Sequence, residues 1–86
     1  MLLTYTHIDD GTRWCEVFDP AQLKTVLSIL NNDPNYRYVM VREYSTEEVE
    51  FVRDDNDDSW VLVSEPGRLA EIVNEVLKAK TESVGT

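Results

Sequence analysis

The sequence predicts an α+β domain with the element order ββαβββα, in which two amphipathic helices pack on one face of an antiparallel sheet. Three observations carry this prediction. Five short segments are rich in β-branched and aromatic residues or alternate apolar and polar residues with the period of a strand, and two longer segments repeat apolar residues with the period of a helix. Short turn signals separate neighbouring strand segments, as in hairpins.

The first hairpin is predicted over residues 2–18, where two segments rich in β-branched and aromatic side chains flank Asp10-Gly11. Asp-Gly favours a two-residue turn, because a type I′ turn needs residues that tolerate positive φ. Such a turn would place His7 and Cys15 on opposite faces, whereas a three-residue loop would place them on the same face.

Two helices are predicted, near residues 20–31 and 65–79. Asp19 can cap the first, Pro20 suits its first position, and Ser64 is the expected cap of the second. Each helix has one apolar stripe. The stripe residues that we expect to be mostly buried are Leu23, Val26, Leu27, Leu30, Leu69, Ile72, Val73, Val76 and Leu77.

Three strands are predicted between the helices, over residues 36–44, 46–53 and 60–63. A three-residue loop at 45–47 would place Arg42 opposite Glu50, which is a favourable charge pair. The acidic run 54–58 is predicted to be a solvated turn. Because two helices can cover only one face of the sheet, the other face is a predicted partner or dimer surface.

The length of 86 residues indicates a single domain, with residues 1–80 globular and residues 81–86 a frayed C-terminal tail. Apolar residues make up 42% of the chain and charged residues 29%, which are globular values. The single cysteine excludes an internal disulfide. Without a visible secretory signal or an apolar run of about 18 residues, we expect a reduced, cytoplasmic domain that does not contact membranes.

The negative charge of the chain is concentrated in residues 43–65. This segment has nine acidic residues and one arginine, and so supplies −8 of the formal net charge of −9. A concentrated negative field repels nucleic acid and anionic membranes, and it favours basic proteins or divalent cations. We therefore predict no direct contact with nucleic acid.

Our leading hypothesis is a small acidic, non-enzymatic protein-binding domain that engages a basic protein surface through residues 43–65. A nucleic-acid-binding enzyme has such a surface, and the size and charge are those of small inhibitors and nucleic-acid mimics, although no motif places the chain in such a family. Carboxylates would select the partner, and aromatic side chains such as Tyr38 would anchor it. The predicted partner-binding residues are Glu43, Glu47, Glu48, Glu50, Asp54, Asp55, Asp57, Asp58, Tyr44 and Trp60.

The alternative is a divalent-cation-binding module centred on the turn 54–58. The candidate ligands Asp54, Asn56, Asp58 and Glu65 have the spacing of positions 1, 3, 5 and 12 of an EF-hand loop. Against this, Ser59 replaces the turn glycine, Pro66 follows the last ligand, and the preceding segment alternates like a strand. A third hypothesis is a small structural or accessory homodimer built on the uncovered sheet face.

No catalytic residue and no cofactor are predicted. The chain has one histidine, His7, and one cysteine, Cys15, and its three glycines are isolated, so no glycine-rich phosphate loop exists. The carboxylates fall in turns or on solvent faces, where no pocket would adjust their pKa values for acid–base chemistry.

Overall fold

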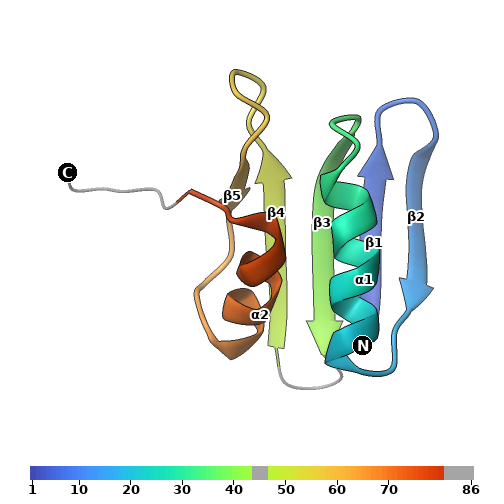
Figure 1. Cartoon of the computed structure of the whole chain (residues 1–86), viewed down its shortest axis with the longest axis vertical. Helices are drawn as coiled ribbons and strands as arrows, with labels where there is room; N and C mark the ends of the chain where they lie inside the picture. The colour runs from blue at the N-terminus through green and yellow to red at the C-terminus, as the bar shows by residue number, and fades with distance from the viewer. Residues whose placement is uncertain (44–46, 81–86) are drawn as a thin grey trace.

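The computed structural model describes residues 1–43 and 47–80 and confirms the predicted α+β class and element order. The strands are β1 (Leu2–His7), β2 (Gly11–Glu16), β3 (Tyr36–Glu43), β4 (Glu47–Arg53) and β5 (Trp60–Leu62), and the helices are α1 (Pro20–Asn31) and α2 (Arg68–Leu77). The five strands form one antiparallel sheet in the order β2-β1-β3-β4-β5. Both helices lie on the same face of this sheet, α1 over β1 and β3 and α2 beside β4 (Figure 1).

The core lies between the helices and the face of the sheet that they cover. Strand residues Val39 and Phe51 are fully buried there. Of the predicted apolar stripes, the buried residues are Leu23, Leu27, Leu30, Leu69, Val73 and Leu77, and the half-buried ones are Val26, Ile72 and Val76. The 3.6-residue spacing therefore identified the inward faces of both helices.

Helix α1 begins as predicted, because Asp19 Oδ1 accepts a hydrogen bond of 2.8 Å from the Gln22 amide. The predicted start of the second helix, with Ser64 as its cap, is wrong. Helix α2 begins at Arg68, and its N-cap residue is Gly67, which has no side chain that could cap the helix. Ser64 lies outside the helix because its Oγ accepts a hydrogen bond of 3.0 Å from the Glu50 amide. This bond holds the hydroxyl at the sheet, away from the helix end.

The register of the first hairpin also differs from the two-residue turn that Asp-Gly favours. His7 lies opposite Gly11, so residues 8–10 form a three-residue loop, and Cys15 lies opposite Leu3. Gly11 has a φ of +82° and begins β2 rather than closing the turn. This register buries Leu3 against the helices, and it leaves Trp14 exposed on the opposite face.

The chain after α2 returns to the sheet and covers its β5 edge. Lys78 ends the helix in the left-handed conformation, with a φ of 53°. The Lys80 amide then donates a hydrogen bond of 2.9 Å to the Trp60 carbonyl. The predictions of a tail at 81–86 and of an anchor at Tyr44 lie outside the described residues. Neither helix is long and apolar enough to cross a membrane.

Candidate functional site

The acidic turn 54–58 is folded around two basic side chains. Arg37 donates from Nη1 to Asp58 Oδ1 at 2.8 Å and from Nη2 to Asp55 Oδ1 at 2.9 Å. Lys80 Nζ lies 2.9 Å from Asp54 Oδ2 and also contacts Asp57. The turn is exposed to solvent as predicted, but residues distant in sequence also supply cations to all four of its carboxylates.

Hydrogen bonding to the carboxylates shifts their protonation. The Ser59 hydroxyl and amide both donate to Asp57 Oδ1, and together with Lys80 they lower the pKa of Asp57 to about 2. The bond from Lys80 likewise lowers the pKa of Asp54, and the two aspartates raise the pKa of Lys80. Asp54 and Asp57 are thus ionised at neutral pH and paired with Lys80.

The candidate cation ligands are not brought together. Asp54 and Asp58 lie in the turn but contact different cations, Lys80 and Arg37. Glu65 lies after β5, beside the far end of β4, because Val63 pairs with Glu50. Glu50, which marks the level of Val63, is four residues from Asp54 along β4, and this is a distance of roughly 13 Å in a strand. Within the described part of the chain, no group of three His, Cys, Asp or Glu side chains is placed to hold a metal ion.

At the opposite end of the sheet, Glu47 helps to hold α2 in place. Its Oε2 accepts a hydrogen bond of 3.3 Å from the Leu69 amide in the first turn of the helix. A carboxylate here satisfies a free N–H group and interacts favourably with the helix dipole. Glu47 therefore supplies the cap that the sequence assigned to Ser64, which gives this predicted partner-binding residue a structural role.

The predicted pairing of Arg42 with Glu50 is wrong by two residues. Arg42 lies opposite Glu48, and its Nη2 is 3.0 Å from Glu48 Oε2. Glu43 lies opposite Glu47 at the last position of the ladder. This register extends Arg53 beyond the end of the β3–β4 pairing, where it reaches backbone carbonyl groups near the end of α1.

The predicted anchor Trp60 cannot contact a partner, because its side chain is only 1% exposed. It packs in the core, where its ring lies beneath the guanidinium of Arg53. The sequence suggested a surface role because Trp60 follows an acidic turn. Residues 60 and 62 of a strand point to the same face. Because Leu62 lies opposite the buried Phe51, Trp60 also faces the helices.

His7 and Cys15 share the covered face but do not form a catalytic pair. His7 lies opposite Gly11 in the β1–β2 ladder, and Cys15 is four residues further along β2. The two side chains are therefore roughly 13 Å apart along the strands. His7 Nδ1 accepts a hydrogen bond of 3.0 Å from the Asp9 amide, and its ring packs edge-on against Tyr36. Burial raises the pKa of the Cys15 thiol, which disfavours the reactive thiolate.

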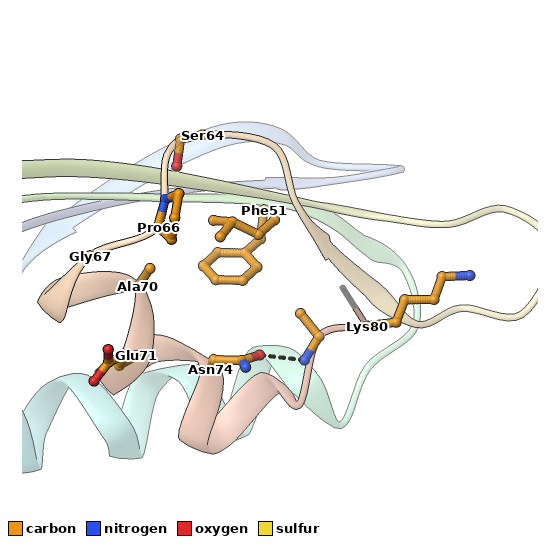
Figure 2. Close-up of a pocket in the computed structure, with 10 residues that line it drawn as sticks. Phe51, Ser64, Pro66, Gly67, Ala70, Glu71, Asn74 and Lys80 are labelled. Atoms are coloured by element: carbon orange, nitrogen blue, oxygen red, sulfur yellow. Dashed lines mark hydrogen bonds between the residues drawn. The ribbon is translucent and has the colours of Figure 1, made fainter. Parts of the chain in front are cut away.

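A pocket of about 380 Å³ lies between α2 and the β4–β5 side of the sheet. Figure 2 shows the Phe51 ring at its base and Ala70 on its helical wall. Lys80 extends away from the ring, in keeping with its ion pairs to the acidic turn. Asn74 Oδ1 is occupied by the Ala79 amide at 2.5 Å. The remaining lining is mostly apolar and suits an apolar group.

Neither helix of the described chain covers the other face of the sheet, which we call the open face. Cross-strand pairing arranges its side chains in three rows that run across the strands. The first row is Thr12, Thr6, Tyr38, Val52 and Val61, and the second is Trp14, Thr4, Met40, Glu50 and Val63. The third row is Glu16, Leu2, Arg42 and Glu48. Trp14 is 68% exposed and Val63 is 53% exposed. Apolar side chains fill much of the middle of the face, and carboxylates lie toward one end.

The polar groups of the open face are partly ordered by one another. The Tyr38 hydroxyl donates a short hydrogen bond of 2.6 Å to Glu50 Oε2. Burial and this bond raise the pKa of Tyr38 to about 12, so Tyr38 stays neutral at physiological pH. Thr6 and Thr12 share a hydrogen bond of 2.8 Å between their hydroxyl groups. These two hydrogen bonds fix the orientation of polar side chains on the open face.

The sequence predicted that one sheet face would be uncovered, but it did not identify the residues on that face correctly. A two-residue turn at Asp10-Gly11 would place Trp14 on the same face as Leu3, which is buried. In the three-residue-loop register, Leu3 lies opposite Cys15 and both face the helices. Trp14, the neighbour of Cys15, then faces the opposite side of the sheet, which is the open face.

Comparison of the chain with protein-family models, with curated proteins and with solved structures finds no significant match.

Proposed function

We propose that this chain is a non-enzymatic binding protein and that its partner docks on the open face. The observation that carries this proposal is a five-stranded sheet with both helices on one side and an exposed tryptophan on the other. Tryptophan is enriched among the residues that contribute most to protein–protein affinity. An apolar patch framed by polar residues is typical of an interaction surface.

The chemistry of the open face indicates the chemistry of the partner. Its middle is apolar, with Met40 and Val52 half-buried between exposed side chains. Of its charged residues, three are carboxylates and one, Arg42, is a cation. The whole chain adds a formal charge of −9. The complementary partner is a protein with an apolar centre and a lysine- or arginine-rich rim, which the negative field would attract.

This proposal keeps the basic protein partner expected from the sequence but moves the contact surface. Glu48 and Glu50 of the acidic segment belong to the open face. The turn 54–58 is left out, because Arg37 and Lys80 neutralise part of its charge. For the same reason, we do not extend the proposal to mimicry of a nucleic acid, which needs an array of unpaired negative charges.

Affinity capture with matched variants tests the proposal. Val63→Lys replaces an exposed apolar side chain on the open face by a cation, and Ile29→Lys makes the same change on α1, where Ile29 is 61% exposed. We expect wild type and Ile29→Lys to retain the same basic protein, and Val63→Lys to bind it at least about tenfold more weakly, or about 1.4 kcal/mol. The association rate should also fall as salt is raised.

Two results would count against an open-face site. One is a partner that both lysine variants lose equally. The other is the absence of any basic protein that the wild type retains and Val63→Lys does not. In either case the pocket beside Phe51 becomes the next site to examine.

A further inference from the structure

Strand β2 has an unpaired outer edge. Met1 and Val17 exchange hydrogen bonds of 2.8 and 2.9 Å, which fixes the alternation of the β1–β2 ladder. From this pair onward, odd-numbered residues of β2 direct their backbone groups toward β1. The N–H and C=O groups of Thr12, Trp14 and Glu16 therefore point outward, and no strand of the described chain lies beyond them.

The other edge of the sheet is protected, which makes the difference at β2 informative. Strand β5 has three residues, and the chain after α2 bridges it through Val61 and Lys80. The bond from the Lys80 amide to the Trp60 carbonyl occupies one of its outward groups. Natural proteins shield edges by such short strands and coverings. Strand β2 is twice as long and lacks proline, lysine and any covering segment among the described residues.

Charge and hydrophobicity make β2 suited to self-association. The strand contains one cation, Arg13, and one anion, Glu16, so its formal charge is zero in a chain of −9. Among the described residues, three of the five exposed large hydrophobic side chains lie on it or beside it in sequence, namely Ile8, Trp14 and Phe18. Most of the negative charge lies elsewhere, because residues 43–65 supply −8 of the formal net charge.

We propose that two copies of this chain pair antiparallel through β2 and form one continuous sheet. A two-fold axis perpendicular to the sheet would keep both open faces on the same side. All three outward residues find partners only when Trp14 faces Trp14 of the second copy and Thr12 faces Glu16. This register makes roughly six backbone hydrogen bonds, as in an ordinary antiparallel ladder.

The neighbouring registers are less favourable. Moving the second copy by one pair in one direction places Arg13 opposite its own copy, and moving it in the other direction leaves Thr12 without a partner in β2. The central register also puts two tryptophan rings side by side, which is a favourable cross-strand pair. It keeps the acidic turns 54–58 at the two outer edges of the joint sheet, because β5 lies at the edge opposite β2.

Sedimentation of the full chain at increasing concentration tests this pairing. We expect wild type to reach twice the 9.9 kDa mass of the chain, with a dissociation constant on the order of 10–100 µM, as for an interface below about 1,200 Å². Trp14→Lys puts two cations on the axis, and Trp14→Pro removes the central outward N–H. Each should raise the dissociation constant at least about tenfold.

Two matched variants keep the test decisive. Ile29→Lys removes a similarly exposed apolar residue from α1 and should leave dimerisation unchanged.

The proposed register places residue 13 opposite Cys15 of the second copy, at about 4.5 Å between Cα atoms. Oxidised Arg13→Cys should therefore form a covalent dimer, whereas Arg13→Cys/Cys15→Ser should not.

A wild type that stays monomeric up to about 1 mM, the weak end of measurable affinities, would overturn the proposal. So would a dimer that Val63→Lys dissociates and Trp14→Lys does not, because it would place the contact on the open face away from β2. Since the inference rests on the strand edge and not on partner binding, a monomer leaves the proposed function to its own test. A dimer through the open face would instead compete with the partner for the same surface.

Discussion

The guanidinium carbon of Arg53 lies 4.4 Å from the centroid of the Trp60 ring, and both side chains donate to the same oxygen, Asn31 Oδ1. Arg53 is only 7% exposed, and it donates to the backbone carbonyls of Asn31, Asp33 and Tyr36. The carbonyls at the end of α1 favour a cation there. This cluster ties the last turn of α1 to β4 and β5.

Replacing Asn31 by alanine should destabilise the fold. The substitution leaves the Trp60 indole N–H and one guanidinium N–H of Arg53 without their acceptor, and an unsatisfied buried donor costs about 1–3 kcal/mol. The free energy of unfolding in urea measures this loss. Asn32→Ala, one residue later at an exposed position, is the matched control and should change stability by less than about 0.5 kcal/mol. Equal losses in both variants would contradict a special role for Asn31.

The acidic turn should make the protein less stable in acid. The pKa of Asp57 is about 2 in the folded state, below its ordinary value of 3.8, because Ser59 and Lys80 favour the carboxylate. Its contribution to stability is therefore complete above about pH 4 and is lost as the pH falls toward 2. Urea unfolding at pH 5 and at pH 2.5 should show this loss. Asp57→Asn should lose less stability between the two pH values, and an unchanged difference would show that Asp57 does not contribute.

Tyr38 should ionise only at high pH. Its folded pKa of about 12 exceeds the ordinary value of 10.0, first because of burial and then because of its bond to Glu50. The neutral phenol is favoured in the folded state, so this contribution to stability is present below pH 10 and is lost as the pH rises from 10 to 12. The phenolate absorbance of wild type minus that of Tyr38→Phe isolates the group.

The variant Glu50→Gln separates the two causes of this shift. Removing the carboxylate should lower the pKa of Tyr38 part of the way toward 10.0, because burial remains. A Tyr38 that ionises near pH 10 in the wild type would contradict the bond to Glu50 and the order that it gives the open face.

The elements of this fold were predictable because their signals are local. Asp19 and Pro20 mark the start of α1, and alternation marks β4, where Val49 and Phe51 face the core. What failed depended on contacts between distant residues. Ser64 was a plausible local cap, but Glu47 on another strand fills that role.

The candidate site was harder to predict for the same reason. The negative charge of residues 54–58 is plain in the sequence, but the pairing of that turn with Arg37 and Lys80 arises from the sheet order and from the return of the chain after α2. The exposure of Trp14 depends on one detail of register, the three-residue loop after His7. A shift in register changes which side chains face the core, and local turn preference did not decide it.

The measurement that tests the central claim most directly is a methyl NMR titration of the labelled protein with the basic protein retained in affinity capture. We predict that the methyl signals of Met40, Val52 and Val61 on the open face shift as the partner is added, whereas those of Val26 and Ile29 on α1 do not. Shifts confined to the helical layer or to residues around the pocket at Phe51, with the open-face signals unchanged, would contradict the account.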